Sequence, residues 1–311
     1  MPAHFRPSNG DTKLLSPLDL ARPEHGTWIG VTTSGKVAVL VNYRDVDTEY
    51  NMKETSRGVL PLNFLCSNDS DEEWKKRLMS KMQSGTSDVD FKKIGGFTLL
   101  YGSLKIDPKT NRIDHLNILS NRGHYGKVFE SHSSSEEDEH CSHYDDDDEI
   151  ASKSTFGLSN SLYNEPWKKV YLGEDLVKRM ISRSIEQGNW TENRLVEECF
   201  SILSQNTYKQ SIADQDDYDL KLLELRNSIF VPPIDLGGEN STCVSIGKYY
   251  GTRTQTVILL DKCGYLHYYE KNLHSSDIEQ LDKPQIVSHY KFSIFDDSQD
   301  GKSNMNMKKS M

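Results

Sequence analysis

The sequence predicts an α+β protein in which layered antiparallel sheets are flanked by helices. Two observations support this fold class. Several β-rich runs are joined by short turns, which favours antiparallel hairpins. The elements also follow the order strands, helix, strands, helices, strands, which differs from the regular alternation of a parallel doubly wound sheet.

The first β-rich run is GTWIGVTTSGKVAVLVNYRD, from Gly26 to Asp45. The Thr-Ser-Gly turn at residues 33–35 ends in a glycine, which supplies the positive φ of a tight hairpin. We therefore expect a buried hairpin. Further runs at residues 95–106 and 114–120 predict a second hairpin, with its turn at residues 107–111.

Three segments, residues 69–83, 174–186 and 191–204, carry apolar side chains at helical spacing. Asn68 and Asp71 are the cap candidates of the first. We expect one amphipathic helix followed later by two core-facing helices. Their apolar positions are Trp74, Leu78, Met79 and Met82, then Leu176, Met180, Ile181 and Ile185, then Leu195, Cys199, Ile202 and Leu203.

The last third of the domain returns to β-structure. Residues 242–248, 254–261 and 265–271 predict a meander whose sharpest turn is Asp-Lys-Cys-Gly at 261–264, and residues 290–295 predict a final strand.

We expect a single domain at residues 15–295, after a flexible N-terminus at residues 1–14 and before a disordered tail at residues 296–311. Two insertions interrupt the domain. A disordered acidic insertion at about residues 130–153 contains SSSEEDEHCSHYDDDDE, which repels itself and has no apolar core. A polar insertion follows at about residues 206–219.

The composition excludes several classes of protein. A net charge of −10 with scattered Lys and Arg argues against nucleic-acid binding. Five cysteines without CxxC spacing predict neither a disulfide framework nor a zinc site, and favour a reducing compartment. His132, His140, Cys141 and His143 could bind a transition metal or haem weakly. We interpret them instead as an incidental cluster and predict no metal site. Without a run of about 18 apolar residues, we expect a soluble, cytoplasmic protein with no transmembrane segment.

The stretch STFGLSNSLYNEPWKK, residues 154–169, is the first candidate site segment. It places Gly157, Ser159 and Asn160 before a helix and adds the large side chain of Trp167. Such a loop can direct an amide toward a substrate oxygen. The structural alternative is that Asn160 satisfies its own backbone and that Trp167 packs at a core edge.

The second candidate segment is YYGTRTQTVILL, residues 249–260. Arg253 stands at the start of an apolar strand and could bind a carboxylate, a phosphate or an oxyanion. Gly251 allows close backbone approach. The alternative is a surface arginine paired with one of many acids. Elsewhere, Asn42 ends a strand and could point into a cleft, whereas the bulk of Trp28 suggests core packing.

Five motifs in series, GTWIG, VNYR, NRG at residues 121–123, STFGLSNSLYNEPWKK and YYGTRTQTVILL, closely resemble the NRDE family, also called the Transport and Golgi organisation protein 2 family. The resemblance runs from about Leu15 to Phe295. It implies the αββα layers of N-terminal-nucleophile hydrolases of the choloylglycine hydrolase kind, which use a Cys directly after the initiator Met. By that analogy Asn42 and Asn160 would be oxyanion-type positions and Arg253 would close the site.

The sequence departs from the family pattern at its start. The family opens with a Met-Cys strand and the Asn-Arg-Asp-Glu motif, whereas Pro2 here offers no thiol. We therefore expect the first strand to be missing, and the chain as written not to be an enzyme. We favour a start recorded too late over a true loss of the motif.

The resemblance implies a role in Golgi organisation and protein secretion, and in haem or acyl-lipid handling, for a cytoplasmic protein associated with the Golgi or mitochondria. The main hypothesis is binding of a small amphipathic anion, haem or acyl-CoA, with haem as cargo and not cofactor. An amide or ester hydrolase with its Cys upstream of this start is the alternative. An interaction protein using the acidic run is compatible with either. The predicted ligand-binding residues are Trp28, Gly157, Ser159, Trp167, Tyr249, Gly251 and Thr252.

Overall fold

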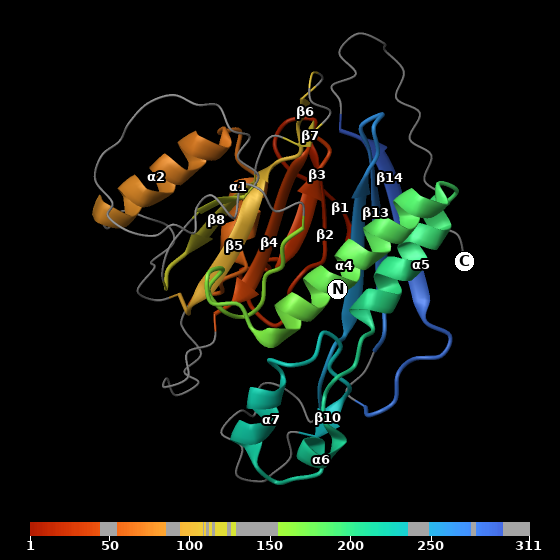
Figure 1. Cartoon of the computed structure of the whole chain (residues 1–311). Helices are drawn as coiled ribbons and strands as arrows, with labels where there is room; N and C mark the ends of the chain where they lie inside the picture. The colour runs from red at the N-terminus through yellow and green to blue at the C-terminus, as the bar shows by residue number, and fades with distance from the viewer. Residues whose placement is uncertain are drawn as a thin grey trace, which may run out of the picture. The chain divides into compact units, whose positions relative to one another are not determined.

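The computed structural model describes residues 1–43, 55–84, 94–107, 109, 112–113, 116–122, 126–128, 155–235, 249–274 and 278–294. The chain divides into two compact units, residues 1–164 with 293–299 and residues 165–292 with 300–311. Figure 1 shows their helices and strands. The predicted acidic insertion up to residue 153, the strand at 242–248 and the tail at 296–311 lie outside the described residues.

Unit 1 contains a seven-stranded sheet in the order β1-β2-β3-β4-β5-β8-β9. Every neighbouring pair in it is antiparallel. A short pair, β6 (Ile106–Asp107) and β7 (Arg112–Ile113), extends beyond β5 and β8. The sheet strands are β1 (His4–Pro7), β2 (Lys13–Ser16), β3 (Ile29–Thr32), β4 (Lys36–Asn42), β5 (Phe97–Ser103), β8 (Leu116–Ser120) and β9 (Gly126–Val128).

Both predicted hairpins are confirmed. β3 and β4 pair across the turn at residues 33–35, where Gly35 has a φ of +87° and donates its N–H to the Thr32 carbonyl. β5 pairs with β8 along its length, from Thr98 opposite Ser120 to Tyr101 opposite Asn117. Part of the turn predicted at residues 107–111 lies outside the described residues.

The first fourteen residues require a correction, because they contain β1 and the start of β2 rather than a flexible segment. Phe5 lies opposite Leu15 in this pair. Leu14 and Leu15 are both fully buried, and the N-terminal ammonium donates to the Leu18 carbonyl at 2.8 Å. Two adjacent leucines that are both buried leave no period-2 pattern, so alternation cannot reveal the strand.

Among the described residues two helices precede β5, and only the second was predicted. α1 (Val59–Leu65) contains a proline in its first turn, where a missing N–H costs nothing. α2 (Asp71–Ser84) is confirmed, but its cap is neither Asn68 nor Asp71. Ser70 Oγ accepts from the Glu73 N–H while the Glu73 carboxylate accepts from the Ser70 N–H, which forms a capping box. Asp71 instead accepts bonds from the N–H and hydroxyl of Ser103.

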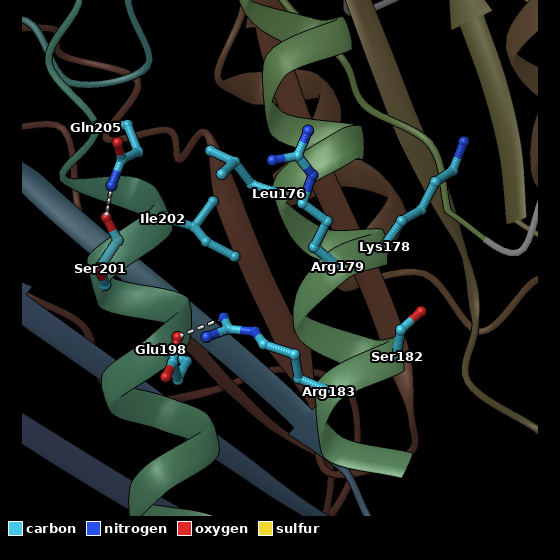
Figure 2. A pocket seen from close by; sticks show the side chains of 9 residues that line it. All are labelled: Leu176, Lys178, Arg179, Ser182, Arg183, Glu198, Ser201, Ile202 and Gln205. Carbon is cyan, nitrogen blue, oxygen red and sulfur yellow. Dashed lines mark hydrogen bonds and ion pairs between the residues drawn. The ribbon is translucent and has the colours of Figure 1, made fainter. Parts of the chain in front are cut away.

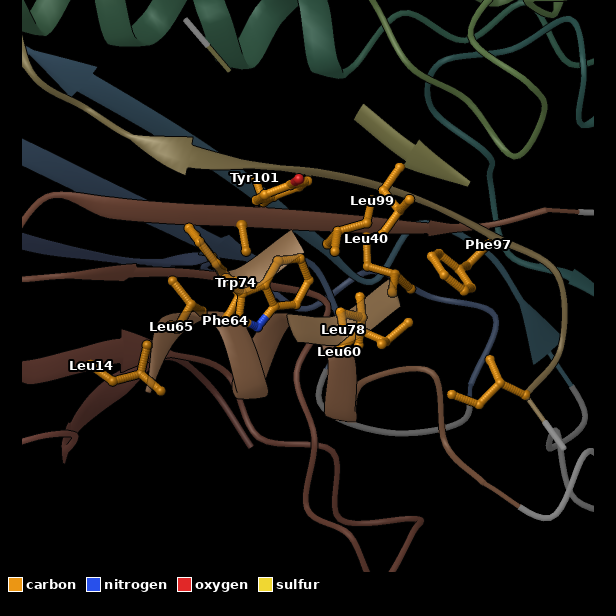
Figure 3. Close-up of a cluster of buried hydrophobic side chains, with 13 residues drawn as sticks. Leu14, Leu40, Leu60, Phe64, Leu65, Trp74, Leu78, Phe97, Leu99 and Tyr101 are labelled. Atoms are coloured by element: carbon orange, nitrogen blue, oxygen red, sulfur yellow. The ribbon is translucent and has the colours of Figure 1, made fainter. Parts of the chain in front are cut away.

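An aromatic triad joins α1, α2 and β5 at the centre of the unit 1 core (Figure 3). The Trp74 ring centroid lies 5.1 Å from that of Phe64 and 4.9 Å from that of Tyr101. The indole N–H of Trp74 donates to Asn63 Oδ1 at 2.9 Å. Trp74 is therefore fully buried without an unsatisfied polar atom.

The ammonium group of Lys36 fixes the turn that follows α1. Its Nζ donates to the carbonyls of Ser67 and Asp69, each at 2.8 Å, and to Ser67 Oγ at 3.0 Å. It also lies 4.7 Å from the Phe64 ring centroid. β4 is thus tied to the segment from which α2 starts.

In unit 2, α4 (Lys168–Gln187) packs beside α5 (Glu192–Leu203), and α5 contacts the three-stranded sheet β12-β13-β14. The strands are β12 (Thr254–Leu260), β13 (Tyr265–Asn272) and β14 (Ile286–Ser293). Val196 and Phe200 of α5 form a small core with Val257 and Tyr269. The predicted turn at residues 261–264 is confirmed, with the Gly264 N–H donating to the Asp261 carbonyl.

Two details of the helices differ from prediction. α4 starts six residues before Glu174, directly after the Pro-Trp pair. Ile181 and Ile185 are 38% and 74% exposed, so these two positions are not core-facing. Met180 and Val170 are the buried side chains of α4, and Leu176 is half-buried.

The polar stretch at residues 206–219 is not wholly loop, because it contains α6 (Gln210–Ala213) and the start of α7 (Tyr218–Glu224). Asp217 caps α7 by accepting from the Leu220 N–H. Tyr208 packs with Leu222, Leu225, Val231 and Ile234. A short pair, β10 (Ile234–Asp235) with β11 (Tyr249–Tyr250), closes this part.

The α+β class with antiparallel sheets is confirmed, whereas the αββα layering and the missing first strand stay predictions. Among the described residues, no helix is long and apolar enough to span a membrane.

Replacing Trp74 with alanine should lower the free energy of unfolding by about 3–5 kcal/mol, because it empties the centre of the aromatic triad. Urea denaturation monitored by circular dichroism measures this loss. Lys76→Ala on the exposed face of α2 is the matched control and should change it by less than about 0.5 kcal/mol. Equal effects of the two substitutions would contradict the described core.

Candidate functional site

Three predicted residues of the first segment lie in a loop of unit 1 beside the central sheet. The loop is anchored where the Thr98 hydroxyl of β5 donates to the Ser161 carbonyl at 3.1 Å. The buried hydroxyls of Ser159 and Ser161 are 2.7 Å apart. Gly157 and Asn160 are half-buried in the same loop.

Asn42 belongs to the same end of the sheet as this loop. It is the last residue of β4 and lies opposite Phe97, while Val41 lies opposite Thr98. The end of β4 therefore lies next to Thr98, the residue of β5 that anchors the loop. A joint oxyanion role for Asn42 and Asn160 stays a prediction.

Trp28 does not pack in the core as its bulk suggested. Its side chain is 46% exposed, although its carbonyl accepts the Leu40 N–H at 2.8 Å and holds it beside β4. Because an exposed indole can contact a ligand or a partner, the binding role of Trp28 stays a prediction.

In unit 2, Trp167 is the N-cap residue of α4 and has an extended backbone. Two cations flank its ring: Lys169 Nζ and the Arg226 guanidinium carbon, each 5.3 Å from the ring centroid. The backbone holds the pair in place, because the Lys169 N–H donates to the Arg226 carbonyl at 3.1 Å. We call Trp167, Lys169 and Arg226 the Trp167 cluster.

Lys169 is electrostatically unusual. Burial away from water lowers its pKa to about 8, because the charged form loses hydration. Within the part of the chain that the structure describes, neither Lys169 nor Arg226 has a carboxylate within ion-pair distance. Two cations beside an aromatic face can therefore accept an anion with an apolar body.

Lys169 and Arg226 were not among the predicted site residues. Lys169 ends the motif STFGLSNSLYNEPWKK and could have been included on that ground. Arg226 follows α7, far along the chain, and no spacing rule connects it with Trp167.

The second predicted segment makes contacts that are mainly structural. Thr252 exchanges two hydrogen bonds with Val231, its N–H donating to the carbonyl and its hydroxyl accepting the N–H, both at 2.9 Å. Tyr249 of β11 pairs with Asp235. The Arg253 carbonyl accepts the Leu273 N–H, while its side chain is exposed. The anion-binding role of Arg253 stays a prediction.

Gly251 supports the predicted close backbone approach. A Cβ at this position would lie 3.1 Å from the Pro232 carbonyl oxygen and from the Pro233 nitrogen. This is tighter than ordinary contact, and backbone atoms cannot easily move away.

A groove between α4 and α5, about 650 Å³ in volume, was not predicted (Figure 2). Leu176 and Ile202 give it apolar walls, and two of its cations are already neutralised. Arg183 lies 3.0 Å from Glu198, and Arg179 lies 2.7 Å from Asp175. Its remaining lining residues are Lys178, Ser182, Ser201 and Gln205.

Gly251→Ala should lower the free energy of unfolding by roughly 1–3 kcal/mol, because the added methyl group forces the backbone away from the two prolines. Thermal or urea denaturation measures it. Gly173→Ala in α4 is the control. A Cβ at Gly173 would contact only the Ile229 side chain, at the ordinary distance of 3.7 Å. Because alanine has the higher helix propensity, this substitution should raise the free energy of unfolding by up to about 1 kcal/mol. An unchanged free energy of unfolding in Gly251→Ala would contradict the close approach of Gly251 to Pro232 and Pro233.

Comparison with known proteins places the chain in a family. The family model for Transport and Golgi organisation 2 matches residues 1–275. An uncharacterised protein of Saccharomyces cerevisiae is 29% identical over 297 residues, which cover 90% of this chain and 88% of the relative.

Two relatives have family names. The Transport and Golgi organization protein 2 homolog of Bos taurus is 28% identical over 276 residues, 88% of this chain and 82% of the relative. The homolog of Homo sapiens is 25% identical over 269 residues, 86% of this chain and 80% of the relative. Because the family model matches most of the sequence, the chain belongs to the Transport and Golgi organisation 2 family.

Proposed function

We propose that this chain is a non-enzymatic binding protein for a small amphipathic anion, haem or a long-chain acyl-CoA. The observation that carries the proposal is the Trp167 cluster, in which two cations lie over one indole ring. Haem and acyl-CoA each combine an apolar body with carboxylates or phosphates. An aromatic face with adjacent Lys and Arg donors suits both parts of such a ligand.

The Trp167 cluster suits this ligand better than the groove between α4 and α5. Arg179 and Arg183 of the groove already have carboxylate partners, so an incoming anion would have to compete with Asp175 and Glu198. Lys169 has no such partner among the described residues, and its partial burial strengthens the field that it exerts on an anion.

The names of the bovine and human relatives, which refer to transport and Golgi organisation, support a cellular role in that process. We propose that the bound anion links this chain to the organisation of the Golgi and to secretion. Association with Golgi or mitochondrial membranes is part of the same proposal.

Substitutions in the Trp167 cluster should weaken binding of the proposed ligands. Full-length protein is titrated separately with haem and with palmitoyl-CoA by calorimetry. Trp167→Leu and Arg226→Gln should each weaken binding by roughly tenfold or more, since one lost charge-assisted contact is worth about 1.5–3 kcal/mol.

The matched control is Trp190→Leu. That ring also lies near two arginines, 5.8 Å from Arg183 and 4.5 Å from Arg194, but Arg183 is paired with Glu198. Trp190→Leu should bind as the wild type does. No saturable binding of either ligand, or equal losses at Trp167 and Trp190, would refute the proposal.

Binding should also depend on pH through Lys169. Its pKa of about 8 means that the ammonium form predominates below that pH and is lost above it, so affinity for an anion should fall between pH 7 and pH 9.5. Lys169→Arg should abolish this fall, because arginine stays charged throughout. Calorimetry at both pH values measures the difference, and an unchanged fall in Lys169→Arg would exclude Lys169 as its source.

A further inference from the structure

Glu192, His267 and His289 of unit 2 converge from three different elements. Glu192 is the first residue of α5, His267 lies within β13 and His289 lies within β14. One ligand atom from each lies within 4.8 Å of the other two. The residues are far apart in the sequence and form no motif, so this cluster could not be predicted from spacing.

The three ligand atoms lie close enough together to share one metal ion. Glu192 Oε1 lies 2.6 Å from His267 Nδ1 and 4.0 Å from His289 Nε2. In a tetrahedral zinc site with bonds of about 2.0–2.1 Å, neighbouring ligand atoms are about 3.3 Å apart. Each of the two distances differs from that value by about 0.7 Å, so metal binding would require the side chains to move by that amount.

The histidine nitrogens are buried but not satisfied. The His267 side chain is only 4% exposed. His289 Nε2 makes no hydrogen bond, and the contact of His267 Nδ1 is the one with Glu192 Oε1 at 2.6 Å. Because buried polar atoms are normally paired, a buried nitrogen without a hydrogen bond beside this carboxylate favours a shared metal ion.

Neighbouring groups provide the outer support that metal ligands use. Asp261 Oδ2 lies 3.7 Å from His267 Nε2, the nitrogen opposite the proposed ligand atom. The Tyr269 hydroxyl donates to Glu192 Oε1, and the Tyr269 ring stacks on His289 with centroids 4.0 Å apart. At 3.7 Å the Asp261 carboxylate is beyond hydrogen-bond distance and acts on His267 through its charge.

One cation lies near the cluster. Lys291 follows His289 by two residues on β14, and its Nζ lies over the Tyr265 ring, 4.8 Å from the centroid.

We propose that His267 Nδ1, His289 Nε2 and Glu192 Oε1 bind one divalent transition-metal ion of the zinc class. Two imidazoles and one carboxylate are ligands that Zn²⁺ prefers. Because Glu192 is 42% exposed, water can reach the fourth position. The ion would clamp the start of α5 to β13 and β14.

The test must separate this cluster from the second set of donors in the chain, His140, Cys141 and His143, which lie outside the described residues. Full-length protein, freed of metal with a chelator, is titrated with Zn²⁺ by calorimetry and with Co²⁺ by visible absorption. The wild type should bind one equivalent in this cluster and give the spectrum of tetrahedral Co²⁺ with nitrogen and oxygen ligands. Its melting temperature should rise with added Zn²⁺.

Two variants remove ligands at positions that are not fully buried, so both should fold. His289→Asn and Glu192→Gln should each weaken binding by at least about a hundredfold and abolish the cobalt spectrum. Tyr269→Phe, which removes only the outer hydrogen bond, should weaken binding by about 10–100-fold. Circular dichroism checks the fold of each.

The matched control is the triple variant His140→Asn, Cys141→Ser, His143→Asn, which should keep the cobalt spectrum and the rise in melting temperature. Loss of both in this triple variant would overturn the proposal. So would unchanged affinity in His289→Asn, or no saturable binding by the wild type.

Discussion

The ammonium group of Lys36 is the contact on which the helical layer of unit 1 depends. Placing it among the carbonyls that follow α1 costs hydration, and desolvation lowers its pKa. The carbonyls of Ser67 and Asp69 offset that cost at 2.8 Å each. The Lys36 ammonium also donates to the Phe64 carbonyl in the last turn of α1 at 3.5 Å, where the partial negative charge of the helix end stabilises a cation.

This contact determines where α2 begins and therefore where Trp74 lies. Asp71 of the first turn is also held by two bonds from Ser103 of β5. With both ends of the Ser67–Asp71 segment fixed, α2 can turn Trp74 toward Phe64 and Tyr101. The predicted loop site then rests on a rigid edge, because Thr98 of β5 anchors Ser161.

The functional proposals for unit 2 rest on helix starts. Trp167 is the N-cap residue of α4 and has Lys169 and Arg226 over its ring. Glu192 is the first residue of α5 and lies near two histidines. The two proposals concern different ligands, an amphipathic anion and a metal cation, so the failure of one would not refute the other.

Much of the fold could be predicted from local patterns in the sequence. The hairpin around Gly35 and the helix containing Trp74 follow from turn chemistry and helical spacing. α1 was not predicted because Pro61 interrupts its short apolar run. β1 was not predicted because a strand of four residues is too short to show the alternation of apolar and polar side chains. Arg226, His267 and His289 of the proposed sites reach their neighbours only through tertiary contacts, which no local sequence pattern encodes.

The central claim, that the Trp167 cluster holds an amphipathic anion, is tested most directly by photocrosslinking. Full-length protein is irradiated with a photoreactive acyl-CoA, and the labelled peptides are mapped by mass spectrometry with unlabelled palmitoyl-CoA as competitor. We predict competable labelling of the peptides that contain Trp167 and Arg226. Competable labelling confined to the groove residues of α5, Glu198 to Gln205, would contradict the claim.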